Sequence, residues 1–462
     1  MRGRRASGRG GAKNIFRGDC RLSANSTLRG FLDAGFSAYH RSMTSALPTA
    51  RGLSFEDARH LVEQHARLVS PREAETVEIL SAFGRVLAET IAADRDFPPF
   101  PRATRDGYAV RAQDVAQVPV SLQVIAEIKA GSTLDPSFNV EPDQAAPIMT
   151  GAPLPPGADA VVMIEHTIQT GNSVEINRSV KSAENFVPRG AEARRGQTLL
   201  DRGTRLDHAA IAIAASVGKS SLQVFRKPRV AVLATGDEIV EVNQTPGPAQ
   251  IRNSNTYSIA AQVQQAGGEP VLLPIAPDEP ARLRELIEQG LESDLLLLAG
   301  GVSMGKYDLV EQVLGELNAG FYFTGAQIQP GRPIVFGSCM RSRTEVSDPH
   351  RQYFFGLPGN PVSTMVTFEL FVRPMIQALS GGNPQPLIFL KGRLKSEVRT
   401  KTGLKRFLPA VLSGEFENAE VELARWQGSG DIAALAGANC YLVIPPDRER
   451  IAAGESVSLL MR

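Results

Sequence analysis

The first regular pattern of apolar and polar residues lies between residues 54 and 90. Apolar side chains such as Ala58 and Val62 recur there near helical spacing, which predicts a helical segment. Between about 107 and 184, short runs of β-forming residues alternate with Gly, Pro, Asn and Asp, a pattern typical of a small β domain. Helical patterning returns over 208–216. The β unit is therefore predicted to be inserted into a helical one.

From residue 228 onward, the pattern changes to an alternation of strand and helix. The run 294–299 is apolar after its first residue, as expected of a strand that is buried on both faces. Gly267 and Gly268 supply the end of a predicted helix. Such alternation predicts a parallel, doubly wound sheet. The expected strands cover 230–234, 271–275, 294–299 and 354–357, and the expected helices cover about 254–267, 280–291 and a segment from 361 onward.

Turn-rich segments separate these patterns into parts. A Gly/Pro linker at 381–384 closes the α/β pattern, and short β runs such as 441–444 follow it. The predicted parts are a disordered or misassigned N-terminal tail (1–50), a helical linker domain in two pieces (51–95 and 185–226), an inserted β domain (96–184), an α/β domain (227–384) and a C-terminal β domain (385–462).

The distribution of charged residues along the chain argues against nucleic acid as a partner. The 50 Lys and Arg residues nearly cancel the 49 Asp and Glu residues, but the first 50 positions hold nine basic side chains against only Asp19 and Asp33. The rest of the chain is therefore net negative, whereas nucleic-acid binders usually gather basic charge on a folded domain. No apolar run approaches the roughly 20 residues that span a bilayer. We expect neither a nucleic-acid nor a membrane partner.

Cysteine usage bears on the compartment. Cys20, Cys339 and Cys440 form no CxxC pair, which argues against a disulfide framework and a thiolate zinc site. We therefore expect a reducing compartment and a cytoplasmic enzyme. The Arg-rich, Ser-rich start could be read as a transit peptide, but a disordered tail or a misassigned start is the preferred interpretation, with Met43 as an alternative first residue.

Three unusual loops follow predicted parallel strands, where ligands bind in a doubly wound sheet. TGDE follows the first strand at 235–238, GGVSMG follows the buried strand at 300–305, and PGNP follows the last strand at 358–361. Glycines let backbone N–H groups converge on phosphate or another anion, although a tight turn needs glycine for conformation alone. In the last loop Asn360 can cap a helix and Pro361 can occupy its first turn. The candidate ligand-binding residues are Thr235, Gly300, Gly301, Ser303, Gly305, Pro358, Gly359, Asn360 and Pro361, with Ser363 and Thr364 just beyond.

Three acids are expected at the same edge of the sheet: Asp237, Glu238 and Asp308. Carboxylates beside a phosphate cradle usually bind a hard cation such as Mg²⁺, which neutralises phosphate charge while a bond to phosphorus breaks. The alternative interpretation is that these three acids are solvent-exposed and cap helices or turns without binding a metal. Elsewhere, Asp106 lies in a loop-like DGYA segment, where an Asp is either a turn former or a carboxylate presented to a cleft.

Taken together and in order, these segments resemble the molybdopterin molybdenumtransferase family, which includes the E-domains of gephyrin-like proteins. The resemblance covers about residue 54 to the C-terminus. Its motifs are DGYA at 106–109, TGAPLPPGAD at 150–159, TGDE at 235–238, GGVSMG at 300–305, PGRP at 330–333 and GLPGNPVS at 356–363.

This resemblance implies an α/β multidomain fold with a molybdopterin-binding-like α/β domain and a C-terminal small β-barrel. It implies a homodimer whose active cleft lies between the α/β domain of one subunit and the inserted β domain of the other. The implied reaction cleaves the phosphoanhydride of adenylated molybdopterin with Mg²⁺ and molybdate, and it releases AMP and molybdenum cofactor. Asp106, Glu238 and Asp308 match acids important for activity, Thr150 matches a cleft residue, and Pro358 and Pro361 match prolines that shape the substrate pocket.

For molybdate, the resemblance and the need of an oxyanion for a cation point to Arg332 in the PGRP turn. The family commonly has Lys there, and Arg keeps the charge. Ser363, Lys405 and Ser429 are further candidates for molybdate contact, Arg406 adjoins one of them, and Glu192 stands where many members have Asp.

Two other functions remain open at this point. A molybdopterin adenylyltransferase has a similar α/β domain but typically lacks the two β domains. A non-catalytic, gephyrin-like scaffold would need partner-binding surface beyond the shared core. An adenylyltransferase and the apoproteins of molybdoenzymes are possible partners.

Overall fold

The computed structural model describes residues 52–133, 135, 137–301, 309–340 and 351–462. Ser303, Gly305 and Asp308 lie outside the described residues, as does the predicted tail over 1–50. Within the described ranges, every helix is too short or too polar to traverse a bilayer.

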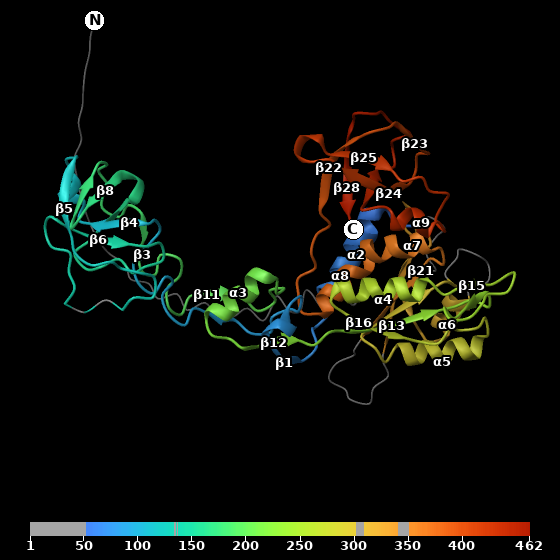
Figure 1. The fold of residues 1–462 in the computed structure, drawn as a ribbon. Coiled ribbons are helices and arrows are strands. Elements are labelled where there is room, and N and C mark those ends of the chain that lie inside the picture. Colours follow the sequence, from blue (N-terminus) through green and yellow to red (C-terminus); the bar gives the residue numbers. More distant parts are fainter. Residues whose placement is uncertain (1–51, 134, 136, 302–308, 341–350) are drawn as a thin grey trace, which may run out of the picture. The chain divides into compact units, whose positions relative to one another are not determined.

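A six-stranded sheet forms the centre of the α/β domain, in the order β16, β13, β17, β21, β20 and β18. Figure 1 labels β13, β16 and β21 of this sheet. The first four of these run parallel, as the alternation of strand and helix predicts. β20 differs, because it is antiparallel to both of its neighbours. No helix lies between β18 and β20, so no crossover connection makes these two strands parallel. The strands are β13 (Arg229–Ala234), β16 (Glu269–Leu272), β17 (Leu295–Ala299), β18 (Gly320–Thr324), β20 (Val335–Met340) and β21 (Arg351–Leu357).

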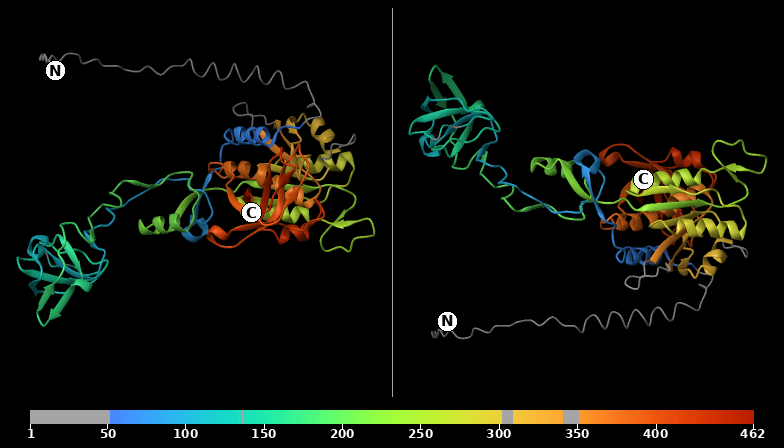
Figure 2. Two further views of the ribbon diagram at one scale, coloured as in Figure 1. Left: turned by 90° about the horizontal axis from the view of Figure 1, so that it is seen from above. Right: turned by 90° about the horizontal axis from the view of Figure 1, so that it is seen from below.

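The sheet is buried on both faces, and helices lie on both sides of it (Figure 2). Leu295 and Leu297 of β17 join one hydrophobic cluster, whereas Leu296 and Leu298 join another, because successive side chains of a strand point to opposite faces. The first cluster is covered by α2, α4, α7 and α8, and the second by α5 and α6. These helices are α2 (Phe55–Ala66), α4 (Asn255–Ala266), α5 (Pro280–Gly290), α6 (Leu309–Glu316), α7 (Pro361–Thr367) and α8 (Arg373–Leu379), with a π-helical turn at Phe368–Val372.

The helix expected over 54–90 is much shorter in the structure, where α2 ends at Ala66. Its start agrees with the sequence, since Ser54 accepts a hydrogen bond from the Asp57 N–H. Beyond α2, strand β1 (Ala74–Glu78) pairs antiparallel with β12 (Ser221–Phe225), and a 3₁₀ helix follows at Ile79–Ala82. Pairing with a strand far along the chain overrides the local helical pattern.

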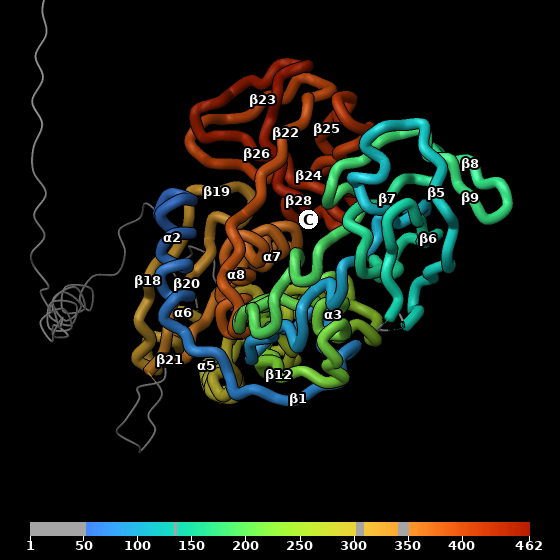
Figure 3. Tube along the Cα trace, turned by 90° about the vertical axis from the view of Figure 1, so that its left-hand side faces the viewer, coloured from blue at the N-terminus to red at the C-terminus, as the bar shows by residue number. Residues whose placement is uncertain are grey.

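The inserted β domain contains a six-stranded sheet in the order β7, β4, β6, β5, β9 and β8, and Figure 3 follows the chain through it. Two short ladders, β2 with β11 and β3 with β10, join the chain entering this domain to the chain leaving it. The helix predicted over 208–216 is confirmed as α3 (His208–Ser216). The strands are β2 (Ile91–Ala92), β3 (Arg102–Ala103), β4 (Gly107–Val110), β5 (Val120–Val124), β6 (Gln144–Ile148), β7 (Ala160–Met163), β8 (Thr167–Thr170), β9 (Ser173–Ile176), β10 (Phe186–Val187) and β11 (Thr198–Leu200).

The C-terminal domain is a small β-barrel, as expected. Its strands follow the order β24, β25, β22, β28 and β26, and pairing of β26 with β24 closes the ring. Strand β19 (Ile328–Gln329), from the α/β domain, adds to β24 in parallel. The barrel strands are β22 (Phe389–Leu394), β24 (Lys405–Ser413), β25 (Glu420–Leu423), β26 (Cys440–Ile444) and β28 (Ser456–Met461); β23 (Val398–Arg399) pairs with β27 (Arg450–Ile451), and α9 covers Ile432–Ala436.

Candidate functional site

A cavity of about 410 Å³ opens at the carboxyl ends of β13, β17 and β21. From β13 the chain crosses through α4 on one face of the sheet, whereas α5, which leads to β17, lies on the other face. The cavity therefore lies at the topological switch point, where ligands bind in doubly wound sheets. It is lined by Thr235, Glu238, Ile239, Ile251, Arg252, Asn253, Ser254, Asn255, Ala299, Gly300, Gly301, Pro333, Pro358, Gly359, Asn360 and Pro361.

The glycine turn after β17 can be built only from glycine. Gly300 and Gly301 have positive φ angles of 98° and 64°. A Cβ atom on Gly301 would lie 2.6 Å from Cγ2 of Val310 and 2.8 Å from Oγ1 of Thr235. Both conformation and close packing therefore exclude a side chain, and the backbone itself forms this wall of the cavity.

The turn at 358–361 is fixed by hydrogen bonds from two neighbouring elements. Asn255, at the start of α4, donates from Nδ2 to the Gly359 carbonyl at 2.7 Å. Thr364 of α7 donates from Oγ1 to the carbonyls of Pro358 and Asn360. Asn360 occupies the N-cap position of α7, but its side chain makes no capping hydrogen bond. The turn is held from outside, so its own side chains remain available to the cavity.

The Asn255 amide also has an unsatisfied group. Because Nδ2 donates to a carbonyl, the orientation of the amide is determined, and Oδ1 is left as an acceptor. This oxygen is buried and has no hydrogen-bond partner among the described residues.

The acids at this edge include one that the sequence pattern did not single out. The Asp278 N–H, just beyond β16, donates to Oδ1 of Asp237 at 3.1 Å. Burial and the nearby carboxylates of Asp237 and Glu238 raise the pKa of Asp278. Asp278 could have been found from its place after the second parallel strand, by the rule that selected the other loops. The structure thus groups three acids, of which Glu238 lines the cavity.

These oxygen donors are of the type that Mg²⁺ prefers. The described residues by themselves contain no group of three His, Cys, Asp or Glu side chains arranged to hold a metal ion. Asp308, the remaining expected ligand, lies outside them.

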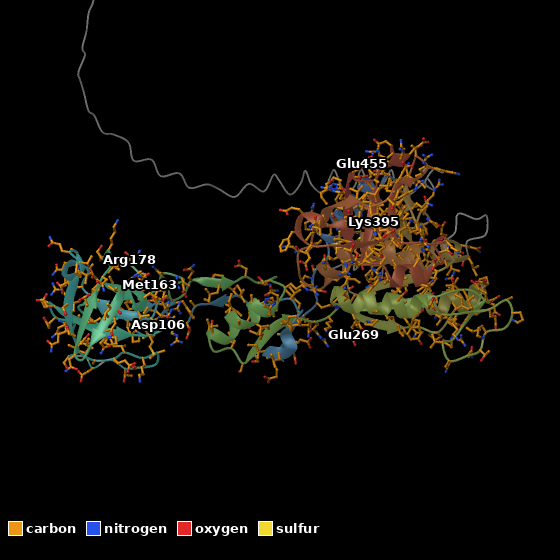
Figure 4. All side chains as sticks on the ribbon, turned by 45° about the horizontal axis from the view of Figure 1, so that its top comes forward. Asp106, Met163, Arg178, Glu269, Lys395 and Glu455 are labelled. Atoms are coloured by element: carbon orange, nitrogen blue, oxygen red, sulfur yellow. The ribbon has the colours of Figure 1, made fainter. Side chains whose placement is uncertain are left out.

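A second cluster lies in the inserted β domain around Asp106, which directly precedes β4 and is labelled with Met163 in Figure 4. Oδ1 of Asp106 accepts a hydrogen bond of 2.7 Å from the Thr150 N–H. The backbone and side chain of Thr150 lower the pKa of Asp106, which is therefore a carboxylate at neutral pH. Gly107 allows β4 to approach β7, since a Cβ there would lie 1.9 Å from the Val162 carbonyl oxygen.

Glu192 lies in the segment that leads out of the β domain. Its Oε1 accepts a hydrogen bond of 2.8 Å from Nη2 of Arg102. Both side chains are substantially exposed, so the ion pair leaves the carboxylate accessible to solvent.

The PGRP turn lies against α7. A Cβ on Gly331 would meet Cγ2 of Thr367 at 2.4 Å and the Ser363 carbonyl oxygen at 3.5 Å. The Ser429 carbonyl accepts a hydrogen bond of 2.9 Å from the Val362 N–H. Arg332 is exposed, whereas the Ser363 side chain is buried. The C-terminal domain therefore contacts the first turn of α7, and the PGRP turn packs against α7 at Ser363 and Thr367.

Two adjacent basic residues of β24 differ in their surroundings. Lys405 pairs with Glu56 and lies 4.9 Å from the centre of the Phe55 ring. Arg406 is buried, and its Nη1 donates to the Leu404 carbonyl at 3.1 Å. No carboxylate among the described residues pairs with Arg406, and burial lowers its pKa. The family resemblance pointed to Lys405, but the structure pairs Lys405 with Glu56 and gives Arg406 no acidic partner within the described part of the chain.

The structure therefore assigns the expected residues to separate groups. The cavity gathers Thr235, Glu238, Gly300, Gly301, Pro358, Gly359, Asn360 and Pro361. Asp106 and Thr150 form a cluster within the β domain, and Arg332, Ser363 and Ser429 belong to segments in contact with α7 or within it.

Three parts of the chain match known protein families. Residues 53–218 match the MoeA N-terminal region (domain I and II), residues 231–378 match a probable molybdopterin binding domain, and residues 391–461 match the MoeA C-terminal region (domain IV).

Relatives match over most of the chain. A molybdopterin molybdenumtransferase from Nostoc sp. is 37% identical over 403 residues, which are 85% of this chain and 90% of the relative. One from Bacillus subtilis is 33% identical over 398 residues, covering 84% and 90%. A crystal structure of a molybdopterin biosynthesis MoeA protein from Pyrococcus horikoshii is 32% identical, has a TM-score of 0.64 and covers 89% of this chain and 99% of its own. This chain belongs to the MoeA family of molybdopterin molybdenumtransferases.

Proposed function

We propose that this protein inserts molybdate into adenylated molybdopterin with release of AMP, as a cytoplasmic homodimer. The observation that carries the proposal is the cavity at the switch point, where a glycine turn lies beside the carboxylate of Glu238. This site occurs in a chain whose molybdopterin molybdenumtransferase relatives match across 84–85% of its length. An adenylyltransferase or a scaffold is less well supported, because the N- and C-terminal MoeA regions are both present.

In this proposal, the glycine turn binds the phosphoanhydride. The Gly301 backbone N–H donates to a phosphoryl oxygen, and Ser303 and Gly305 are assigned as further donors. The Gly300 N–H is already bonded to the Leu357 carbonyl at 3.2 Å, so Gly300 supplies the shape of the turn. The turn from Pro358 to Pro361 forms the facing wall, and its rigid attachment to α4 and α7 keeps the pocket shaped for one orientation of the ligand. Thr235 is buried and its hydroxyl lies close to Gly301, so it supports the glycine turn from the side of β13.

The carboxylates supply the site for a cation. Asp237, Glu238 and Asp308 would hold Mg²⁺, which when bound neutralises phosphate charge as the bond to phosphorus breaks. Burial is the main cause of the raised pKa of Asp278, and the carboxylates of Asp237 and Glu238 add to it, which agrees with acids gathered at this edge.

Molybdate is a tetrahedral dianion and needs cationic and neutral donors. We assign Arg332, Ser363, Ser429 and the neighbourhood of Lys405 to it. Within that neighbourhood, the buried guanidinium of Arg406 is the better donor, because Lys405 is already paired with Glu56.

The remaining catalytic groups come from the second subunit. Asp106 and Glu192 belong to the inserted β domain and its connection, and Asp106 is already ionised and oriented by Thr150. Dimerisation is supported by α3, an apolar helix of which only Ala210 and Ala214 are buried within the described part of this chain. A helix that is apolar on all sides is normally buried, so a second copy is the expected cover.

The test is AMP release from adenylated molybdopterin, measured against molybdate concentration with the purified full-length protein. We expect release to depend on molybdate and to be lost by at least about a hundredfold in Asp106→Ala, since charge stabilisation at one site commonly contributes that much. Sulfate, another tetrahedral dianion, serves as the control anion. AMP release that is indifferent to molybdate, or wild-type turnover in Asp106→Ala, would reject the mechanism.

A further inference from the structure

Arg252 lies on the wall of the cavity and faces no acidic partner among the described residues. It belongs to β15 (Ile251–Arg252), which pairs in parallel with β14 (Ile239–Val240) just before α4. Its Nε donates to the Gln244 carbonyl at 3.0 Å, so the loop between β14 and β15 restrains the guanidinium. No hydrogen bond joins Nη1 or Nη2 to another described residue, and the outer part of the donor fork is therefore available.

The charges around the cavity make this arginine unusual. Among the described lining residues Arg252 is the only cation, and Glu238 is the only carboxylate. Asp237 and Asp278 add two more acids just outside the lining. Arg252 nevertheless forms no ion pair with any described acid. Its position is set by a backbone carbonyl, which leaves its charge for a ligand.

We propose that Arg252 is a phosphate-binding residue of this cavity, which takes a phosphoryl oxygen of the substrate's anhydride opposite the glycine turn. This inference rests on the proposed function. A guanidinium suits the role because its planar fork matches two phosphoryl oxygens at once, and such charge-assisted pairs are about twice as strong as neutral ones. Without Arg252, the anion would meet the Glu238 carboxylate and no cationic side chain among the described lining residues.

The phosphoryl group can come from either half of the ligand, and matched probes distinguish the two. Calorimetric titration of the full-length protein would compare AMP with adenosine, and 6-hydroxymethylpterin diphosphate with 6-hydroxymethylpterin. Each pair differs only in its phosphate. The variants are Arg252→Gln, which removes the charge, and Arg252→Lys, which keeps the charge but lacks the fork and the Nε donor. Because Arg252 is exposed, both substitutions should leave the fold intact, and circular dichroism verifies this.

We expect Arg252→Gln to weaken binding of the phosphate-bearing probe about tenfold and to leave its phosphate-free counterpart unchanged, given the usual worth of a charged hydrogen bond. The affinity of Arg252→Lys for the phosphate-bearing probe should lie between those of wild type and Arg252→Gln. The affinity of wild type should also decrease more steeply with salt than that of Arg252→Gln. The pair of probes that shows the effect identifies which half of the substrate Arg252 contacts.

Arg282→Gln on α5 is the matched control, since this exposed arginine pairs with Glu285 and does not line the cavity. The same loss of affinity in Arg282→Gln would overturn the proposal by showing a general effect of charge. Equal weakening of a probe and its phosphate-free counterpart in Arg252→Gln would overturn it too, because Arg252 would then act through the fold of its loop. Unchanged affinities of Arg252→Gln for both phosphate-bearing probes would also overturn the proposal.

AMP release by wild type separates this inference from the proposed function. If Arg252 proves not to bind phosphate but wild type still releases AMP in a molybdate-dependent way, the proposed function stands. If wild type releases no AMP, the proposed function itself is rejected.

Discussion

Asp106 shows how one residue is prepared for chemistry by its neighbours. Its carboxylate accepts a hydrogen bond from the Thr150 backbone, and the hydroxyl of Thr150 adds a second stabilising contact. Both contacts favour the charged form and so lower the pKa of Asp106. Because its pKa in the folded protein is below the unfolded value, its stabilising contribution is present above the unfolded pKa and is lost as pH falls through the folded pKa.

We predict that Thr150→Ala raises the pKa of Asp106 toward its usual value, because it removes the hydroxyl contact but keeps the stronger backbone donor. A carboxyl ¹³C titration monitored by NMR would measure the shift. Asp135, whose pKa is lowered by Ser137 in the same domain, should titrate unchanged. An unaltered Asp106 titration in Thr150→Ala would show that the hydroxyl plays no part.

Among elements, the two glycines that follow β17, Gly300 and Gly301, are tightly constrained by packing. Gly301 has a positive φ and faces both Val310 and Thr235, so neither its backbone nor its surroundings accept a Cβ. Gly315, inside α6, needs no special conformation, and a Cβ added there would meet no described atom within 4 Å. Glycine is therefore required at Gly301, where it shapes the site, whereas at Gly315 it only lowers the stability of α6.

We predict that Gly301→Ala destabilises the protein by about 1–3 kcal/mol, the usual cost of a residue held in a sparsely populated conformation. It should also reduce affinity for phosphate-bearing ligands. Gly315→Ala should instead stabilise it by about 0.5–1 kcal/mol. Thermal unfolding by calorimetry compares the two, and equal shifts in the same direction would contradict the assignment of the turn.

In the whole molecule, several apolar groups of the linker domain are exposed in the single chain. Leu80 is 80% exposed and Phe83 63%, and both lie in or beside the 3₁₀ helix that contacts α3. Together with the poorly covered α3, they form a surface that a monomer would leave in water. If the β domain of one subunit completes the site of the other, a substitution that prevents dimerisation through this surface removes activity, although no residue of the site is changed.

We predict that the double variant Leu80→Glu, Phe83→Glu is monomeric by sedimentation velocity and inactive in AMP release, because charges cannot be buried in an apolar interface. Leu68→Glu, at a similarly exposed leucine after α2, is the control and should leave the oligomeric state unchanged. A wild-type protein that already sediments as a monomer, or an active monomeric variant, would refute the two-subunit site.

Much of the fold is readable from the sequence because burial leaves a periodic trace. The apolar run of β17, the helix α3 and the first two glycines of the loop after β17 all appear where the local pattern predicts them. The predictions from local pattern were wrong where pairing with a distant segment determined the structure. The segment after Ala66 became β1 because β12 supplied a partner, and β20 became antiparallel because no helix connects it to β18.

For the site, the sequence by itself determined which loops end the parallel strands and which of their residues carry charge or lack side chains. Only the tertiary structure decided which of these groups meet. It brought Asp278 to Asp237, engaged Asn255 with Gly359, paired Lys405 with Glu56 and left Arg406 and Arg252 without acidic partners among the described residues. The physical reason is that strand and helix periods encode local burial, whereas ion pairs and hydrogen bonds between loops depend on how the crossovers bring remote segments together.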